Sequence, residues 1–373
     1  MALLPIELLV LGIFVCVTII QLAYYWIVFG RLAFYKASDH ENVHYPPVSI
    51  VIVARNEYYN LKKNLPLYLE QKYDDFEVVV VNHISDDETR ELLEDLQRQY
   101  PKLRVVNITQ DLNFFKGKKF PLSLGIKSAA NDIVLLTDAD CSPVGGNWIK
   151  SMAKNYTSNI QVVLGYGPYH KEKGMVNMFI RYDTFMVAMQ YLSYALVGMP
   201  YMGVGRNLSY TRSVFFASGG FTSHYMVSSG DDDLFIGQIA NRKNTKIEVS
   251  PDSFIYSVPK KTFSEWFKQK QRHLTTAKFY KLKFKLLLGL FSVSQFLFYT
   301  SLVVALFISH FYYLIIGLFL LRFISQIIVQ KKVINLLQEK QLLIISLLLE
   351  VFYILLIPII TFKSIFLKPV QWK

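Results

Sequence analysis

The stretch Ile133–Cys141, IVLLTDADC, decides the fold class of this chain, because an apolar run leads directly into two carboxylates. A short run this apolar is typical of a strand buried on both faces of a parallel sheet. Ligands of open α/β sheets bind at the carboxyl ends of such strands. We therefore expect Asp138 and Asp140 at a ligand-binding edge, where their oxygens can hold Mg²⁺ or Mn²⁺ against a diphosphate. The alternative is an Asp-rich turn that caps the following helix.

Three upstream segments have the same character as this strand, and helical patterns separate them. Strand, helix, strand, helix at this spacing predicts a doubly wound, Rossmann-like α/β domain. The expected strands are Val48–Val53, Phe76–Val81 and Leu103–Asn107, and the expected helices run up to Gln71, over Thr89–Tyr100 and from Gly117 onward.

The composition indicates a membrane-associated protein. Of the 373 residues, 52% are hydrophobic and the mean hydropathy is +0.28, which is too apolar for an ordinary soluble enzyme. The formal net charge of +12, from 40 basic and 28 acidic residues, suits an anionic lipid surface or phosphate-bearing ligands. No DNA- or RNA-binding motif occurs, so we expect no nucleic-acid partner. The two cysteines, Cys16 and Cys141, cannot form a disulfide framework and favour a reducing compartment.

Residues 1–30 are expected to form an N-terminal transmembrane anchor, since Leu8–Phe29 is apolar and long enough to cross a bilayer. No basic n-region and no small-residue cleavage site marks a signal peptide. Basic residues follow the span, so the positive-inside rule places the next domain in the cytoplasm, at the cell (inner) membrane. Residues 31–47 are expected to be a linker, and residues 48–285 the α/β domain with interfacial helices.

Residues 286–373 are expected to form a C-terminal transmembrane region of two or three helices. Leu286–Val329 is long enough for two spans with a tight turn near Ser309–His310, and Leu342–Phe362 for a third. Three complete spans would place the lysines of the tail outside, against the positive-inside rule. The last segment, which contains Pro358, is therefore either re-entrant or an exception to that rule.

Two segments of the α/β domain have a composition that is compatible with the membrane surface. Met175–Met202 is apolar and aromatic, but Arg181 and Asp183 interrupt it, so it is expected to be an interfacial or groove-lining helix rather than a span. A capping box, Thr262-x-x-Glu265, opens a second helix rich in lysine and aromatic residues.

Seven motifs occur between Val48 and Tyr280: VSIVIVARNE, VVVVNHISDDET, FKGKKFPLSLGI, LLTDADC, GVGRNLSYTRSVFFASGGF, GDDDLF and QKQRH. Their order and spacing resemble the inverting family 2 glycosyltransferases, which have the GT-A fold. The resemblance implies a nucleotide-sugar donor, expected to be UDP-linked, and Mg²⁺ or Mn²⁺ as cofactor. The membrane helices make a lipid or a glycan at the membrane the expected acceptor.

The resemblance also implies roles for individual residues. Glu57 and Asp87 would hold the nucleoside, and Lys118 the diphosphate. Asp138 and Asp140 would form the metal and diphosphate site, with Asp140 the more direct ligand. Further expected contacts are Arg55, His83, Gln269, Arg272 and His273 on the donor side, and Gly219, Gly220 and Phe221 on the acceptor side.

The run Asp231–Asp233 is expected to supply the catalytic base. Adjacent carboxylates repel one another, so at least one is easier to protonate than a free Asp. Displacement at the anomeric carbon needs a base for the proton of the attacking hydroxyl. The resemblance makes Asp232 this base, Asp231 its neighbour and Asp233 the helix cap. The alternative is that these acids only complement the dipole of the following helix.

The chain departs from the family pattern at three positions. His83 stands where the family has the second member of an acidic pair, which leaves the preference for the donor base open. Pro121 replaces an alanine. His273 replaces the tryptophan of the signature of processive members, which counts against the alternative of a processive polysaccharide synthase. From other classes, a non-catalytic nucleotide-sugar sensor remains an alternative, as does a small transporter, although no internal repeat supports it.

Two charges, Arg322 and Glu350, fall inside the expected C-terminal spans. An unpaired charge at that depth costs at least about 2.5 kcal/mol. In antiparallel helices the two residues lie at the same depth. We therefore predict a structural Arg322–Glu350 ion pair; the alternative is that Glu350 lines the path of an acceptor lipid.

Overall fold

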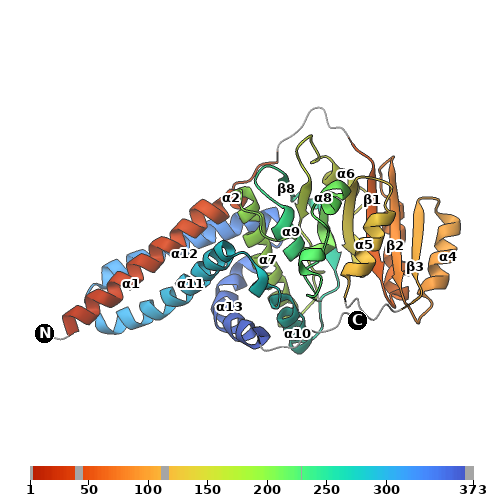
Figure 1. The fold of residues 1–373 in the computed structure, drawn as a ribbon. Helices are drawn as coiled ribbons and strands as arrows, with labels where there is room; N and C mark the ends of the chain where they lie inside the picture. Colours follow the sequence, from red (N-terminus) through yellow and green to blue (C-terminus); the bar gives the residue numbers. More distant parts are fainter. Residues whose placement is uncertain (1–2, 38–44, 111–116, 228, 366–373) are drawn as a thin grey trace.

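The computed structural model describes residues 3–37, 45–110, 117–227 and 229–365, so part of the linker expected over residues 31–47 lies outside the described residues. The α/β domain is built on a seven-stranded sheet with the order β3-β2-β1-β4-β7-β6-β8 (Figure 1). The strands are β1 Val48–Ala54, β2 Phe76–His83, β3 Leu103–Ile108, β4 Ile133–Asp138, β6 Val162–Gly165, β7 Leu208–Thr211 and β8 Thr245–Glu248; β5 Cys141–Pro143 and β9 Ile255–Ser257 form a separate pair.

The register of the four parallel strands brings their carboxyl ends to one edge of the sheet. Val53 of β1 pairs with Val81 of β2 on one side and with Asp138 of β4 on the other. β3 lies parallel beside β2, with His83 opposite Ile108. β7 is antiparallel to both β4 and β6, so the sheet is mixed. The predicted α/β fold class is confirmed.

Helices cover both faces of the sheet, as the alternating pattern predicted. Successive side chains of a strand point to opposite faces. Ile50 and Ile52 of β1 therefore belong to the core under α3, α4 and α6, while Val51 and Val53 belong to the core under α5 and α7. The helices are α3 Tyr58–Leu69, α4 Thr89–Gln99, α5 Lys119–Ser128, α6 Trp148–Ala153, α7 Met175–Leu196, α8 Arg212–Ala217, α9 Asp233–Ile239 and α10 Phe263–Leu274.

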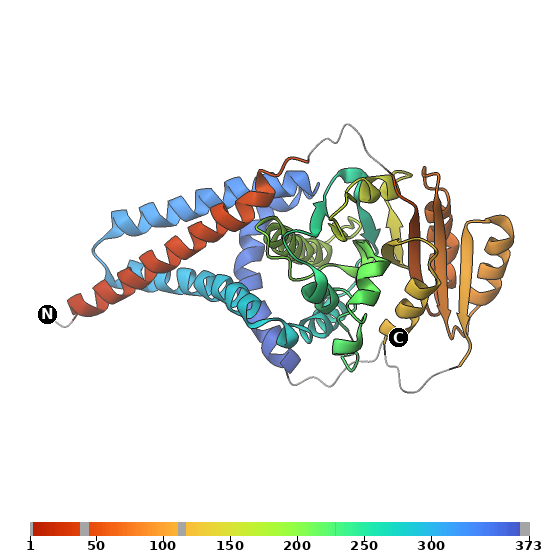
Figure 2. The same ribbon diagram turned by 45° about the horizontal axis from the view of Figure 1, so that its top comes forward.

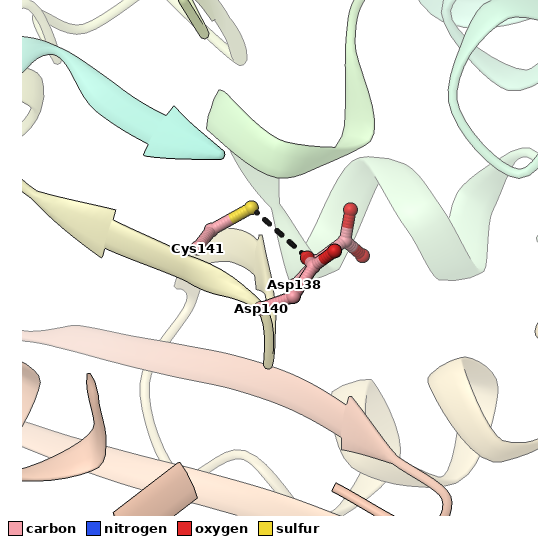
Figure 3. Close-up of side chains that lie close together, drawn as sticks. All are labelled: Asp138, Asp140 and Cys141. Atoms are coloured by element: carbon pink, nitrogen blue, oxygen red, sulfur yellow. Dashed lines mark hydrogen bonds between the residues drawn. The ribbon is translucent and has the colours of Figure 1, made fainter. Parts of the chain in front are cut away.

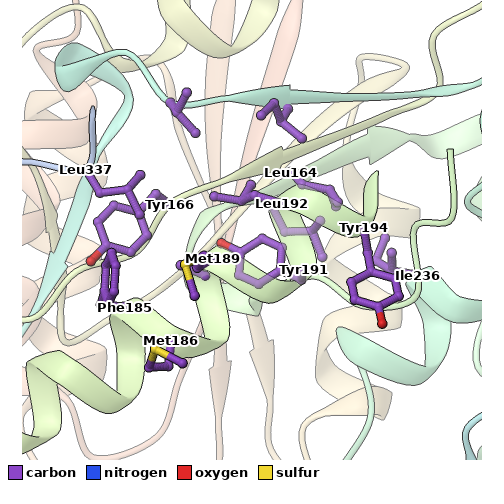
Figure 4. Close-up of a cluster of buried hydrophobic side chains, with 14 of the residues drawn as sticks. Leu164, Tyr166, Phe185, Met186, Met189, Tyr191, Leu192, Tyr194, Ile236 and Leu337 are labelled. Carbon is purple, nitrogen blue, oxygen red and sulfur yellow. The ribbon is translucent and has the colours of Figure 1, made fainter. Parts of the chain in front are cut away.

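Of the two alternatives expected for the segment that contains α7, an interfacial and a groove-lining helix, its buried position is incompatible with the first. α7 is a core helix in which Phe185 and Tyr191 are almost completely buried. Figure 4 shows these side chains packed near Leu164 of β6 and near Leu337, which follows a membrane helix. The two charges that interrupt the helix, Arg181 and Asp183, are paired inside the protein. α7 therefore joins the sheet to the membrane region.

Within the described residues, four helices are long and apolar enough to cross a membrane. The first covers Pro5–Ala33 and combines α1 (Leu3–Ala23), a π-helical stretch η1 (Tyr24–Phe29) and α2 (Gly30–Ala33). The other three are α11 Leu282–Ile308, α12 Tyr312–Leu336 and α13 Leu342–Ile365, and the turn expected near Ser309–His310 is confirmed. α1, α11 and α12 form an elongated bundle that projects from the α/β domain (Figures 1 and 2).

The predicted ion pair inside the C-terminal helices is confirmed. Arg322 of α12 lies 2.7 Å from Glu350 of α13, and the two side chains are 0% and 1% exposed. Gln295 of α11 and Gln326 also donate to the Glu350 carboxylate, and Arg322 donates to Gln21 of α1 at 3.1 Å. The pair is thus the centre of a polar network that ties all four apolar helices together.

Candidate active site

The loops that follow β1 and β2 are tied together at the carboxyl edge of the sheet. The backbone N–H of Asn56 donates to the Ser85 hydroxyl at 3.0 Å, and the Asn56 side-chain oxygen accepts from the backbone N–H of Asp86 at 2.7 Å. Asn56 has a φ of +55°, a left-handed conformation that Asn adopts more readily than most residues. These contacts bring Glu57 and Asp87, the predicted nucleoside ligands, to one place.

Asp87 and Glu57 are held in different electrostatic states. Backbone N–H groups of Tyr58 and Thr89 donate to Asp87 at 3.2 and 3.1 Å. Desolvation acts to raise the pKa of Asp87, but its hydrogen bonds outweigh this and lower the pKa overall. Desolvation raises the pKa of Glu57, and the carboxylates at the end of β4 add to the shift although Asn60 donates to Glu57.

Asp138, Asp140 and Cys141 lie together at the end of β4, with their ligand atoms all within 4.8 Å of one another (Figure 3). Lys118, at the N-cap of α5, forms an ion pair with Asp138. Desolvation acts to raise the pKa of Asp138, but the charge of Lys118 lowers it overall. Desolvation and the neighbouring Asp138 raise the pKa of Asp140. The strand end thus concentrates negative charge as the sequence predicted.

These residues fit a divalent cation. Asp140 is exposed and Asp138 is half-buried, so both carboxylates remain accessible. Their hard oxygen atoms match the preference of Mg²⁺ and Mn²⁺. The Cys141 thiol donates to Asp140 at 3.3 Å and lies 3.0 Å from the Ser257 hydroxyl. Burial raises the pKa of this thiol well above its usual value, so the protonated sulfur is the weakest ligand of the three.

Asp232 stands at the N-terminus of α9 and has the electrostatics of a base. Its Oδ2 accepts from the backbone N–H of Gly205 at 2.9 Å, and its Oδ1 from that of Asp233 at 2.8 Å. Desolvation, followed by the like charges of Asp231 and Asp233, raises the pKa of Asp232 to about 7. A carboxylate with this pKa can accept a proton near neutral pH.

The structure corrects the expectation that Asp233 is the helix cap. The capping side chain of α9 is that of Asp232. Asp233 is buried, and its Oδ2 accepts hydrogen bonds from the hydroxyls of Thr276 and Tyr280, the latter at 2.8 Å. Asp233 therefore ties α9 to the segment between α10 and α11.

α10 carries the expected Gln269, Arg272 and His273. The Gln269 amide donates to the Tyr169 hydroxyl at 3.3 Å, and Arg272 lies 3.2 Å from the exposed His273 ring. Arg272 is close enough to Asp138 for its positive charge to act on the pKa of that carboxyl group. The structure thus places this helix beside the carboxylates of β4.

The remaining predicted residues are described by their positions in the fold. Arg55 is half-buried directly after β1, and His83 is buried as the last residue of β2. Gly219 and Gly220 form a turn after α8 with φ values of +75° and +57°. Phe221 is 2% exposed and its side chain packs inside a cluster of aromatic rings, and its expected contact on the acceptor side stays a prediction.

Arg206 belongs to the site although it was not identified from the sequence. It lies in the 3₁₀ turn η2 (Gly205–Asn207), next to the N–H that binds Asp232. Its guanidinium donates to the Gly167 carbonyl at 2.8 Å and stacks on the Tyr169 ring at 4.6 Å. Its charge also acts on both carboxylates of the metal-ligand group. The GVGRN motif contains this residue, but only the fold shows what it faces.

Lys119 was also missed. Its buried ammonium donates to the backbone carbonyls of His224 and Val227 at 2.6 and 2.8 Å. Desolvation lowers the pKa of Lys119 to about 8, although the carboxylates of residues 231–233 oppose the shift. Lys119 therefore connects the start of α5, beside Lys118, to the loop that leads into the base motif.

The chain matches the family model for glycosyl transferase family 21 over residues 10–373. It belongs to this family. The expectation of a membrane-anchored glycosyltransferase is thereby confirmed, although the matching family carries the number 21 where the motifs suggested family 2. The four apolar helices agree with a membrane location for this family member.

Relatives of this family 21 member include the probable glycosyltransferase YdaM of Bacillus subtilis (strain 168), which is 23% identical over 293 residues covering 72% of this chain and 67% of YdaM. The poly-beta-1,6-N-acetyl-D-glucosamine synthase of Staphylococcus epidermidis is 29% identical over 133 residues, which cover 32% of this chain and 30% of the synthase. Among solved structures, the mannosyltransferase PcManGT from Pyrobaculum calidifontis, in complex with GDP-Man and Mn²⁺, superposes with a TM-score of 0.58 at 19% identity and covers 94% of this chain and 98% of that chain. This likeness confirms the GT-A type of fold.

Proposed function

We propose that the protein is an inverting glycosyltransferase that moves a sugar from a UDP-linked donor to a lipid or lipid-linked glycan at the cytoplasmic face of the membrane. The observation that carries the proposal is a metal-ligand group, Asp138 and Asp140, near a carboxyl group with a pKa of about 7, Asp232. Lys118 links the two, because its ammonium pairs with Asp138 and also interacts with the charges of Asp231 and Asp232.

Asp232 is the general base in this proposal. Its carboxylate takes the proton of the acceptor hydroxyl while the hydroxyl oxygen attacks the anomeric carbon and the bond to the diphosphate breaks. A single displacement of this kind inverts the configuration at that carbon. The N–H groups of Gly205 and Asp233 orient the carboxylate, since they fix both of its oxygens.

Basic side chains supply positive charge near the leaving diphosphate, on the other side of the reacting sugar from the base. Lys118, Arg206 and Arg272 all act on Asp138, so they surround the place where a diphosphate would meet the metal ligands. Asp138 and Asp140 would hold Mg²⁺ or Mn²⁺, which when bound neutralises the leaving diphosphate. In this proposal Glu57 and Asp87, which follow β1 and β2, hold the nucleoside.

A membrane-borne acceptor is supported by the arrangement of α10. This helix carries Gln269 and Arg272 and contacts α13, one of the four apolar helices. The catalytic residues therefore lie a short distance from lipid-facing surface. A hydroxyl at the end of a lipid or lipid-linked glycan can reach them without leaving the membrane.

The proposal is tested with full-length protein in lipid nanodiscs. Thermal unfolding is followed with UDP-sugars and GDP-sugars, with Mn²⁺ or EDTA, since a ligand present at 100 times its Kd stabilises the native state by about 2.7 kcal/mol. We expect stabilisation and transfer with a UDP-sugar and Mn²⁺, and Asp140→Ala should remove both effects of the metal. Full transfer activity in EDTA would contradict the metal dependence.

His83 provides a separate test of the donor base. If this residue replaces an acid that contacts the base, His83→Asp should change the preference among UDP-, GDP- and dTDP-linked sugars. Competition by the free nucleotides against the same donor measures that preference. An unchanged profile in the His83→Asp variant would show that another residue reads the base.

A further inference from the structure

α13 differs in direction from the other three apolar helices. Figures 1 and 2 both show α13 running across the axis that α1, α11 and α12 share, at the place where the bundle meets the α/β domain. It contacts α10 and α7 of the α/β domain as well as α11 and α12. A helix that crossed the bilayer beside the bundle would run along that shared axis.

The face of α13 that is turned away from the protein is entirely apolar. Its exposed residues recur at spacings of three, four and seven, which places them on one side of a helix. Their exposed fractions reach 90% for Ile344 and 75% for Leu348. The stripe consists of Ile344, Leu348, Val351, Leu355, Ile359 and Phe362.

The opposite face of α13 is covered by the α/β domain. The Tyr353 hydroxyl donates to Asp183 of α7 at 3.0 Å. At the edge of this face, the ring of Phe352, which is 47% exposed, lies 5.3 Å from that of Phe179, and the ammonium of Lys363 lies 5.7 Å above the Phe267 ring of α10. α13 therefore separates the α/β domain from whatever contacts its apolar stripe.

The depth of α13 follows from the polar network around Glu350. Beyond Arg322, α12 extends only about 15 Å further from the α/β domain, and α1 extends about 27 Å beyond Gln21, at 1.5 Å per residue. The hydrocarbon core of a bilayer is about 30 Å thick. Measured from the far ends of these two helices, Glu350 of α13 lies roughly 3–15 Å inside the membrane boundary on the side of the α/β domain. This range includes the depth of about 5–10 Å at which helices lie in the interface.

We propose that α13 lies along the membrane surface on the side of the α/β domain, with its apolar stripe in the acyl chains of that leaflet, and that the chain crosses the bilayer three times. The lipid surface is the partner because the stripe continues the apolar surface of the bundle. The distribution of charge supports the same arrangement. With three crossings, the basic residues near the ends of the helices all lie on the side of the α/β domain, as the positive-inside rule requires. These are Arg31, Lys36, Lys281, Lys283, Lys285, Lys331, Lys332, Lys340 and Lys363.

Sidedness of single cysteines tests this proposal. In full-length protein carrying Cys16→Ala, with the buried Cys141 retained, His310→Cys, Lys340→Cys and Lys363→Cys are labelled by a membrane-impermeant maleimide in intact and in permeabilised cells. His310 and Lys340 flank α12 and therefore report opposite sides. We expect Lys363→Cys to follow Lys340→Cys, because α13 begins and ends on one side.

Labelling of Lys363→Cys with the pattern of His310→Cys would overturn the proposal, since α13 would then cross the membrane. If Lys363→Cys is not labelled at all, a reporter fused after Lys373 decides between the two. Green fluorescent protein fluoresces there if three crossings leave the C-terminus in the cytoplasm with the α/β domain, and alkaline phosphatase is active there if four crossings place it outside. The comparison needs no knowledge of the acceptor and is independent of the proposed transferase activity.

Discussion

Asp232 is the residue whose environment most directly predicts behaviour. It caps α9, accepts two backbone N–H groups and has a carboxylate on each side in the sequence. The hydrogen bonds favour the charged form, whereas desolvation and the two like charges favour the protonated form and outweigh them. The residue therefore combines fixed orientation with a pKa close to the working pH of most enzymes.

Asp232→Asn keeps the shape of the side chain and one of its two hydrogen-bond acceptors but removes its basicity. We expect kcat to fall by about 10²-fold or more while the Kd for the donor nucleotide stays within about twofold. Turnover and donor binding by calorimetry measure the two effects. Asp231→Asn is the matched control, and a larger loss of kcat in that variant would show that the base is assigned to the wrong residue.

The pKa of about 7 also predicts the pH dependence. A general base works only when deprotonated, so kcat/KM should fall as the pH drops below 7, to about one tenth of its plateau one pH unit below the pKa. Because Asp231 raises the pKa of Asp232, Asp231→Asn should move this acidic limb to lower pH. A kcat/KM profile that stays flat from about pH 5.5 to 8 would contradict Asp232 as the base.

The position of a single residue could be predicted where it follows from the neighbouring sequence. It could not be predicted where it depends on contacts between segments that are distant in the sequence. Asp138 and Asp140 follow a buried strand directly, so their position at the edge of the sheet is readable from the sequence. Lys119 and Arg206 interact with Val227 and Gly167, which are 108 and 39 residues away, and no local pattern encodes those contacts.

At the scale of elements, a buried hydrogen-bond network around Asp183 holds α10 in place. Asp183 of α7 accepts from Lys270 at 2.5 Å and from the Trp266 indole at 3.3 Å, both on α10, and from Tyr353 on α13. The sequence predicted α10 and its capping box correctly, but for α7 it left an interfacial and a groove-lining helix as alternatives. Its aromatic composition is compatible with both environments, and only the partners of Asp183 show that the helix is internal.

Lys270→Met would leave the Asp183 carboxylate buried without its cation, a change that typically costs about 3–5 kcal/mol. We expect a lower thermal unfolding temperature and a higher KM for the donor, because α10 carries Gln269 and Arg272. Lys268→Met, on the exposed face of the same helix, should change neither quantity. The double variant Asp183→Asn/Lys270→Met should recover part of the loss in stability. Equal effects of the two lysine substitutions would mean that the hydrogen-bond network around Asp183 does not position α10.

At the scale of the whole molecule, the fold and the membrane region are not independent. The sequence predicted the order of elements well, since strands, helices and spans each have a local periodicity. The domain bounds expected from the sequence, residues 48–285, stay a prediction. In the structure α7 lies between the sheet and the membrane helices, with Arg181 paired to Glu339 beyond α12 through an Nε–Oε2 contact of 3.0 Å.

This arrangement predicts that the α/β domain excised as residues 45–281 is unstable. The excision removes Glu339 and leaves the guanidinium of Arg181, which is 5% exposed in the whole protein, without its carboxylate. A broken buried pair costs about 3–5 kcal/mol, a large part of the roughly 5–15 kcal/mol that stabilises a typical protein. Loss of α13 also uncovers the aromatic side chains of α7 that pack against it, such as Phe179.

The measurement compares soluble yield and thermal unfolding of residues 45–281 with those of the full chain in nanodiscs. We expect the excised domain to aggregate, and the same fragment carrying Arg181→Met to recover part of the yield because no charge is then left unpaired. A wild-type fragment that is monomeric and unfolds near the temperature of the full chain would show that the α/β domain needs no support from the membrane helices. In that case the contacts of Arg181 and Asp183 would only attach two self-sufficient parts, and α7 would be stable with one face in water.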